Sequence, residues 1–220
     1  MPGFTVQHLS NMIHNLFSIP IWKNTLNIDN DIKENLLNQI TQNYEEHKNY
    51  NHPDWNCVVH STNKENNNIN YSDIIPLYKQ EYENFVSENN LNTNYHSYNF
   101  STLWYNYYIK YSNQELHDHL TPNISNGLPL FSAVHYLKLN KDHPKIVFYN
   151  PSLAHMAYNN TNVFGSNVDY SFFKKYFILN VKEGDFIIFP ACLEHAVFQQ
   201  TIDDPRITIS FNIIENLEIN

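Results

Sequence analysis

The second half of the chain is a series of short β-prone segments, each followed by residues that favour turns. The series opens with an aromatic stretch, and no amphipathic helical pattern interrupts it. Many short strands without helices between them are typical of a β-sandwich or barrel. The strands expected are Asn99–Tyr111, Glu115–His119, Phe131–Leu139, Lys145–Tyr149, Tyr176–Val181, Phe186–Phe189, His195–Gln199 and Ile207–Ile213.

The first part of the chain has a different pattern. Between residues 29 and 46, apolar side chains recur at helical spacing behind an acidic first turn, which predicts a helix. A second helix is expected over Tyr71–Asn89, with Ser72 as its N-cap. The apolar run Leu16–Trp22 contains a proline and suits an edge strand, and Asn56–Ser61 suits a short strand.

Helices first and strands afterwards predict an α+β protein. Its 220 residues are enough for one domain with a substantial core. We therefore expect a single domain over residues 1–220. Within it, residues 1–94 form a helical part that packs on a double-stranded β-helix, or jelly roll, over residues 95–214.

Charge and cysteine content exclude several classes of protein. The formal net charge is −9, so binding to a nucleic-acid backbone is not expected. The only two cysteines, Cys57 and Cys192, form no C-x-x-C pair, which argues against a disulfide framework. The N-terminal residues contain no signal-peptide pattern, and no stretch is apolar enough to span a membrane. These features predict a cytoplasmic protein, and they leave its oligomeric state open.

A close pair of histidines, His117 and His119, suggests a metal site. On a regular strand, residues two apart point to the same face, so both imidazoles could reach one ion. The distant His195 would complete a three-histidine Fe(II) site, since neutral imidazole is a good ligand for iron. Asp118 would point to the other face unless a bulge turned it, so its replacing His119 as a ligand stays open.

The other histidines weaken this argument, because the chain has twelve of them. A chance H-x-H pair is therefore unremarkable. His135, His143 and His155 could form a rival cluster, but they fall on separate predicted elements and contain no close pair. We expect these three to be structural or to face a substrate.

An arginine at the start of the last predicted strand suggests an anion site. A buried arginine requires an anionic partner, and its planar fork suits a carboxylate. Thr208 and Ser210 share the face of Arg206 at i+2 and i+4 and add hydroxyl groups. The alternative is an ion pair between Arg206 and Asp203 or Asp204 across the preceding turn.

Together these segments resemble the Fe(II)/2-oxoglutarate-dependent oxygenases, in particular a group of small enzymes often encoded by phages or bacteria. The resemblance covers roughly residues 100–214. It is carried by Gln114–His119, His135-Tyr136-Leu137, Asn150-Pro151, Glu183–Pro190, Leu193-Glu194-His195 and Arg206–Asn212. Where the wider superfamily has an aspartate in H-x-D, this chain has His119.

The resemblance implies a jelly-roll barrel with Fe(II) at its open end and 2-oxoglutarate as the cosubstrate. It implies that Arg206 binds the distal carboxylate of 2-oxoglutarate, with Thr208, Tyr136 and Asn150 close to the cosubstrate. The implied reaction is a dioxygenase reaction that hydroxylates a small molecule or a peptide and releases succinate and CO2. The alternatives are a catalytically silent jelly-roll binding or virion-associated protein, and a cupin-like metal enzyme, against which Arg206 argues.

The segment 150–175 is long, rich in asparagine and lies between two predicted strands. Loops of this length in a compact domain are usually functional. We expect it to border the substrate entrance. Its aromatic residues Tyr158, Phe164 and Tyr170 would either contact a substrate or anchor the loop to the barrel, and anchoring is the more common role.

Overall fold

The computed structural model describes residues 18–49, 58–62, 67–91, 96–120, 128–152 and 174–217. Within these ranges the chain forms two helices and eleven strands. In chain order they are β1 (Trp22–Thr25), α1 (Asn30–His47), β2 (His60–Ser61), α2 (Ile75–Glu88), β3 (His96–Phe100), β4 (Trp104–Tyr108), β5 (Gln114–His117), β6 (Leu128–Lys138), β7 (Ile146–Tyr149), β8 (Tyr176–Ile178), β9 (Asp185–Pro190), β10 (His195–Val197) and β11 (Arg206–Leu217).

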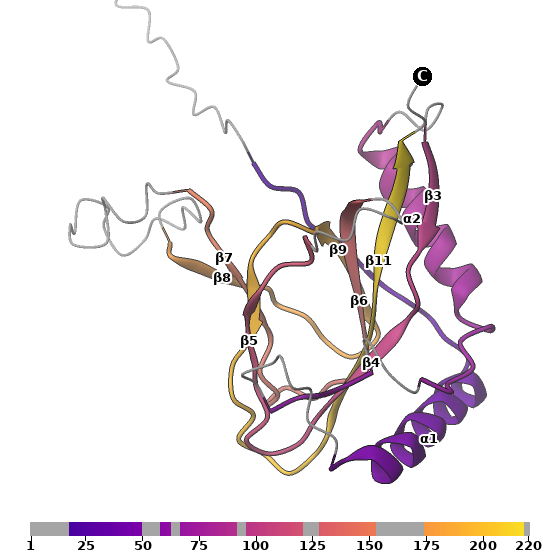
Figure 1. The fold of residues 1–220 in the computed structure, drawn as a ribbon, viewed down its shortest axis with the longest axis vertical. Coiled ribbons are helices and arrows are strands. Elements are labelled where there is room, and N and C mark those ends of the chain that lie inside the picture. Colours follow the sequence, from indigo (N-terminus) through magenta and orange to yellow (C-terminus); the bar gives the residue numbers. More distant parts are fainter. Residues whose placement is uncertain are drawn as a thin grey trace, which may run out of the picture.

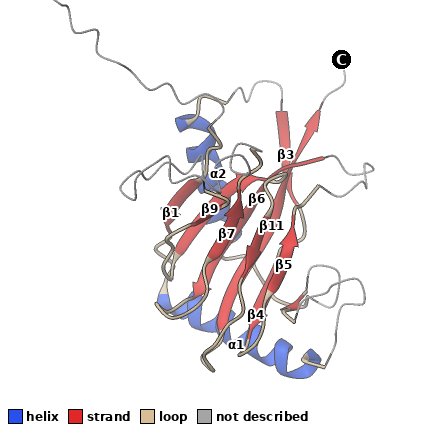
Figure 2. Cartoon of the chain, turned by 90° about the vertical axis from the view of Figure 1, so that its left-hand side faces the viewer, coloured by secondary structure: helices blue, strands red, loops and turns tan. Residues whose placement is uncertain are grey.

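The strands form two antiparallel sheets (Figure 1). The larger sheet has the order β1-β9-β6-β11-β4-β2, and β3 pairs with the far end of β11. The smaller sheet has the order β5-β10-β7-β8. Both helices lie behind the larger sheet when the smaller sheet faces the viewer (Figure 2). From β4 to β11, successive strands of the chain alternate between the larger and the smaller sheet, except that β7 and β8 both belong to the smaller sheet.

Helix α1 confirms the helix predicted over residues 29–46. Asp29 caps its N-terminus by accepting a hydrogen bond from the backbone N–H of Asp31 at 2.9 Å. Leu36, Ile40 and Tyr44 are buried at a spacing of four residues, so one face of the helix packs on the larger sheet. Among the described residues, neither helix is long and apolar enough to cross a membrane.

Helix α2 confirms the second predicted helix, but its start differs from the prediction. It begins at Ile75 rather than near Tyr71, and Ser72 is not its N-cap. Residues 72–74 form a turn in which the Asn70 side chain accepts a hydrogen bond from the Ser72 backbone N–H. The reason is Pro76, which lacks a backbone N–H and is tolerated only in the first helical turn.

The predicted edge strand is present but lies further along the chain. Residues 18–21 have no regular structure, and the strand begins at Trp22, where pairing with Ile188 of β9 starts. Pro20 explains the shift, because it has no N–H to donate to a neighbouring strand. The short strand predicted at Asn56–Ser61 reduces to β2, and its first two residues lie outside the described part of the chain.

Two larger apolar cores hold the layers together, beside a small cluster of Val59, Tyr108 and Val197. The first lies between the helices and the larger sheet, and it contains Tyr78 and Phe85 of α2 together with Phe211 of β11. The second lies between the two sheets and contains Phe189 of β9 and Phe148 of β7, whose rings meet edge to face at 5.0 Å. Because the larger sheet is covered on both faces, its central strands β9 and β11 are buried on both sides, and along β11 the polar residues Arg206, Thr208 and Ser210 alternate with apolar ones.

Candidate metal and cosubstrate site

A cavity of about 300 Å³ opens between the two sheets. The inward-facing residues of β4 and β11 form one wall, and β5, β7 and β10 form the other. Its lining includes all three histidines predicted to bind metal and three of the four residues predicted to bind the cosubstrate. These are His117, His119, His195, Arg206, Thr208 and Tyr136.

The three histidines form a compact cluster. One ring nitrogen from each of His117, His119 and His195 lies within 4.8 Å of the other two. The ring centroids are 4.3 Å apart for His117 and His195, 5.1 Å for His119 and His195, and 5.3 Å for His117 and His119. This spacing allows the three nitrogens to coordinate one ion.

The cluster is built differently from the regular strand that the spacing predicted. His117 is the last residue of β5 and pairs directly with His195, the first residue of β10. His119 lies beyond the strand in a bend, and its backbone N–H donates to the carbonyl of Ala191 at 2.9 Å. The two close histidines face the same cavity, as predicted, but the strand ends at His117 rather than at His119.

Hydrogen bonds fix how each ring is turned. The Nδ1 atom of His117 lies 2.8 Å from the carbonyl oxygen of Glu115, and that of His195 lies 2.9 Å from the carbonyl of Leu193. In His119 the Nδ1 atom lies 2.6 Å from Oδ1 of Asn212. An oxygen of this kind only accepts, so all three Nδ1 atoms carry the proton and all three Nε2 atoms keep a lone pair. Metal-binding histidines are commonly oriented in this way.

Burial keeps these imidazoles neutral. It lowers the pKa of His119 to about 4 and lowers the pKa values of His117 and His195 below the usual range for histidine. Neighbouring histidines lower the pKa of His195 further. Neutral imidazole is the form that binds metal, so the cluster is ready to coordinate an ion without losing protons.

The Asp118 side chain is not part of the histidine cluster and bonds to the backbone instead. Its Oδ1 atom accepts a hydrogen bond from the backbone N–H of Leu120 at 2.9 Å, which stabilises the bend after β5. Among the described histidine, cysteine, aspartate and glutamate side chains, only the three histidines form a group with metal-binding geometry. The arrangement therefore favours His119 over Asp118 as the second residue of the cluster.

Arg206 is buried in the cavity wall with 2% of its surface exposed. Its guanidinium lies over the Tyr108 ring at 4.3 Å and near the Tyr136 ring at 5.4 Å. Within the described structure, its Nε and Nη1 atoms and the Tyr136 hydroxyl have no hydrogen-bond partner. Two buried guanidinium nitrogens and a buried phenol hydroxyl that lack hydrogen-bond partners indicate a missing anionic ligand.

The alternative ion pair of Arg206 with the preceding acids does not form. Asp203 pairs with Lys110 at 3.2 Å, and Asp204 pairs with Lys138 at 2.8 Å. Both carboxylates are thereby engaged outside the cavity. Arg206 itself remains directed toward the cavity.

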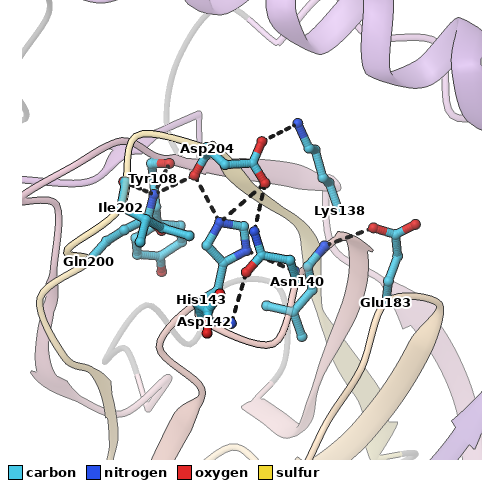
Figure 3. A network of polar contacts seen from close by, with 10 residues as sticks. Tyr108, Lys138, Asn140, Asp142, His143, Glu183, Gln200, Ile202 and Asp204 are labelled. Carbon is cyan, nitrogen blue, oxygen red and sulfur yellow. Dashed lines mark hydrogen bonds and ion pairs between the residues drawn. The ribbon is translucent and has the colours of Figure 1, made fainter.

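A network of polar contacts fixes the turn that leads into Arg206 (Figure 3). The buried Gln200 amide donates to the carbonyls of Tyr108, Ile202 and Asp204 at 3.2, 3.3 and 2.8 Å. The carbonyl of Asp204 also accepts from Nε2 of His143 at 2.8 Å. The start of β11, and with it Arg206, is held by buried side chains from two directions.

Hydroxyl and amide groups continue inward from Arg206. Thr208 and Ser210 follow it on the same face of β11, and Asn106 of β4 bridges their hydroxyls at 3.4 and 3.3 Å. Thr208 pairs with Asn106 on one side and with Tyr136 of β6 on the other. A polar strip therefore runs along the cavity from Arg206 toward the histidine cluster.

The rival histidines have structural surroundings. His135 is buried, and its Nδ1 atom lies 2.9 Å from the hydroxyl of Tyr78 on α2. His143 belongs to the turn network described above, and His155 lies outside the described residues. Neither His135 nor His143 lines the cavity.

The fourth residue predicted to bind the cosubstrate does not reach the cavity. The Asn150 amide donates to the carbonyl of Lys174 at 3.0 Å and accepts from the Ser152 N–H, and Asn150 does not line the cavity. An asparagine before a proline often stabilises its own turn in this way. Most of segment 150–175, including Tyr158, Phe164 and Tyr170, lies outside the described residues.

Sequence reasoning missed several residues of the site. Tyr108, Asn106 and Trp104 line the cavity from β4, but every residue of that strand is buried, so no alternating pattern separated the cavity side from the core side. Gln114 and Asn212 stood in the quoted motifs without an assigned role. The signal for them was their polarity at inward-facing positions of buried strands.

The cavity fits a metal and a dicarboxylate. Three neutral nitrogen donors with free lone pairs are a suitable set for Fe(II), and they leave coordination positions for other ligands. The unpaired Arg206 and Tyr136 groups can accept a carboxylate at the other end. Fold and cavity together define the class of a metal-dependent enzyme with an anionic cosubstrate.

Comparisons with known proteins support this class of enzyme. Residues 102–212 match the family described as "Putative 2OG-Fe(II) oxygenase". The chain belongs to this 2OG-Fe(II) oxygenase family. It is a 2-oxoglutarate-dependent dioxygenase, and its cofactors are Fe(II) and 2-oxoglutarate.

Solved structures share the fold at low sequence identity. A prolyl-4-hydroxylase from Pseudomonas putida has a TM-score of 0.57 at 10% identity, over 90% of this chain and 93% of that chain. HygX from Streptomyces hygroscopicus, with nickel, 2-oxoglutarate and hygromycin B bound, has a TM-score of 0.52 at 13% identity, over 89% of this chain and 83% of that chain. The viral collagen prolyl hydroxylase vCPH from Paramecium bursaria Chlorella virus-1 has a TM-score of 0.51 at 12% identity, over 88% of this chain and 94% of that chain. No curated protein matches the sequence.

Proposed function

We propose that the chain is a hydroxylase whose single domain, residues 1–220, is built on a double-stranded β-helix. His117, His119 and His195 hold Fe(II) through their Nε2 atoms. Arg206 binds the distal carboxylate of 2-oxoglutarate, assisted by Thr208 and Tyr136. The observation that carries this proposal is one cavity that contains both a three-nitrogen cluster and an unpaired buried arginine.

The surrounding residues prepare the site for this reaction. Bound iron and 2-oxoglutarate supply the oxidising chemistry, with succinate and CO2 as coproducts. Asn212 turns His119 toward the cavity, and the Tyr108 ring stabilises the Arg206 cation. Asn150 is left out of the proposal, because its amide binds the backbone of its own loop.

The substrate in this proposal is a small molecule or a peptide. Glu115 and Asp118 line the cavity together with the histidines, which favours a neutral or cationic substrate over an anionic one. The folds of a prolyl hydroxylase and of an enzyme crystallised with hygromycin B are both compatible with this class.

Anaerobic titration with Fe(II) followed by 2-oxoglutarate, and then a succinate assay in air, tests the proposal. We expect one Fe(II) and one 2-oxoglutarate per chain. His195→Ala should lose stoichiometric iron binding, whereas Asp118→Ala should keep it, although it loses the bond to Leu120. Full iron occupancy in His195→Ala, or loss of iron in Asp118→Ala alone, would show that the ligands are wrongly assigned.

A further inference from the structure

Gln114 lies where the histidine cluster meets the rest of the cavity. It is the first residue of β5, it is partly buried, and it lines the cavity three residues before His117. Its Oε1 atom accepts a hydrogen bond from the Tyr108 hydroxyl at 2.6 Å. Its Nε2 atom lies 3.3 Å from Nε2 of His117.

Two contacts fix which end of the amide faces the histidine. The Nδ1–H of His117 donates to the carbonyl of Glu115, so the Nε2 atom of His117 has a lone pair and no proton. Only the NH2 end of Gln114 can donate to that lone pair. The Tyr108 hydroxyl then donates to the Oε1 end, which is consistent with the same orientation.

In the metal-free protein, the Gln114 amide thus donates to the same nitrogen that would bind iron. Metal binding takes up that lone pair, and the amide loses its acceptor. Two adjacent ligand atoms on one metal, each about 2.1 Å from it, lie about 3 Å apart. A bound metal displaces the amide, now 3.3 Å from the His117 nitrogen, from that lone pair, and a small shift of the side chain brings the amide within reach of an oxygen atom bound next to that nitrogen.

We propose that Gln114 donates a hydrogen bond to the metal-chelating end of 2-oxoglutarate, opposite the end held by Arg206. This inference rests on the proposed ligand and cosubstrate sites. A side-chain amide is well suited to the role, because it supplies a fixed donor without adding a charge beside the metal. Gln114 thereby contributes to the affinity for the cosubstrate and to the orientation of its keto acid group.

Tyr108 is the positioning residue in this arrangement. It is 1% exposed, so its ring and hydroxyl are held in place by the surrounding core. Its ring lies on the Arg206 guanidinium at 4.3 Å, and its hydroxyl holds Gln114 at 2.6 Å. One side chain therefore sets the positions of the groups that contact both ends of the cosubstrate.

The test uses anaerobic binding to the full chain, which needs no turnover. Fe(II) is titrated first and 2-oxoglutarate second, and the visible absorption band of the iron-bound keto acid is recorded. Gln114→Leu keeps the size of the side chain but removes the donor. We expect it to bind Fe(II) within about twofold of the wild type, to bind 2-oxoglutarate about tenfold more weakly, and to shift the band.

Two further variants separate positioning from packing. Tyr108→Phe keeps the ring over Arg206 and removes the hydroxyl, so it should shift the same band and weaken 2-oxoglutarate binding less than Gln114→Leu. Gln80→Leu, at an exposed position of α2, is the matched control and should leave both affinities and the band unchanged. Thermal unfolding of each variant verifies that it is folded.

Each outcome has a distinct meaning. Unchanged 2-oxoglutarate affinity and an unchanged band in Gln114→Leu would overturn the inference. Loss of Fe(II) binding in that variant would also overturn it, because Gln114 would then support His117 rather than contact the cosubstrate. If the wild type itself bound neither Fe(II) nor 2-oxoglutarate, the proposed function would fail, and this result is distinguishable from the other two.

Discussion

Each functional side chain of the cavity depends on one neighbour that controls its orientation or its charge. Asn212 turns His119 by accepting its Nδ1 proton, while its Oδ1 atom also accepts from Ser132 at 2.9 Å. Tyr108 lies against Arg206, a cation that has no carboxylate partner among the described residues. Burying guanidinium nitrogens of Arg206 without hydrogen-bond partners costs free energy in the ligand-free protein, and a bound dicarboxylate offsets this cost by accepting those hydrogen bonds.

The first prediction concerns this arginine. Arg206→Ala removes a charge-assisted hydrogen bond worth about 1.5–3 kcal/mol. We expect 2-oxoglutarate to bind about ten- to a hundredfold more weakly while Fe(II) still binds, as measured by anaerobic titration. Lys110→Ala, which removes an exposed cation paired with Asp203, is the control. Unchanged 2-oxoglutarate affinity in Arg206→Ala would contradict the assignment.

The second prediction concerns His135, whose pKa burial lowers to about 3. The unfolded chain binds a proton near pH 6.5, whereas the folded chain keeps His135 neutral. Its contribution to stability is therefore complete above pH 6.5 and falls as the pH drops toward 3. At pH 5 the loss is about 2 kcal/mol.

Urea unfolding of metal-free protein between pH 4.5 and 8 measures this effect. His135→Gln keeps an acceptor for the Tyr78 hydroxyl but cannot titrate. We expect the free energy of unfolding of His135→Gln to fall less steeply with decreasing pH than that of the wild type. The difference between the two slopes should correspond to about one proton per molecule. An unchanged slope would show that His135 is charged in the folded state.

At the scale of elements, the site depends on where strands end. The cluster forms because β5 ends at His117 and β10 begins at His195, so both histidines lie at one end of the smaller sheet. Arg206 lies at the beginning of β11, directly after the turn held by Gln200 and His143. These strand ends bring the metal-binding and anion-binding groups together at the cavity between the two sheets.

The third prediction concerns that turn. Gln200→Leu removes three hydrogen bonds to backbone carbonyls in a fully buried place. We expect the free energy of unfolding to fall by about 1–3 kcal/mol. Because the turn positions Arg206, 2-oxoglutarate affinity should also fall while Fe(II) affinity is kept. Gln199→Leu, next in sequence and exposed, is the matched control. Equal effects of the two variants would contradict a special role for Gln200.

At the scale of the whole molecule, the cavity joins the two sheets. Its histidines belong to the smaller sheet and the bend after β5, whereas Arg206 and Thr208 belong to the larger sheet. A dicarboxylate bound between a metal on one sheet and an arginine on the other therefore links both layers. Ligands that bind only the folded state stabilise it.

The fourth prediction follows from that link. At a hundred times their dissociation constants, Fe(II) and 2-oxoglutarate should each add about 2.7 kcal/mol. For a chain of 220 residues, this corresponds to a Tm increase of roughly 5–10 °C per ligand. Thermal unfolding without oxygen measures it. His195→Ala should abolish the increase caused by Fe(II), and an equal increase in that variant would show that iron binds elsewhere.

The sequence by itself determined the strand-rich second half, both helices and the identity of the clustered histidines. It could do so because hydrophobic periodicity and the strand-and-turn pattern are local, and because the motif residues are sparse and chemically distinctive. The predicted start of α2 was wrong, although the sequence contained the reason: Pro76 restricts where that helix can begin. The family resemblance, carried by residues 100–214, was confirmed.

Only the tertiary structure decided which groups meet. The bend that brings His119 beside His195 depends on a hydrogen bond to Ala191, far along the chain. Lys110 and Lys138 engage the two acids that could have neutralised Arg206. Tyr108 and Gln114 come together because β4 and β5 lie in different sheets that face one cavity. The first two kinds of contact join segments far apart in the chain, and the third joins two sheets across a short connection, so tertiary packing fixes them all and local sequence patterns carry no information about them.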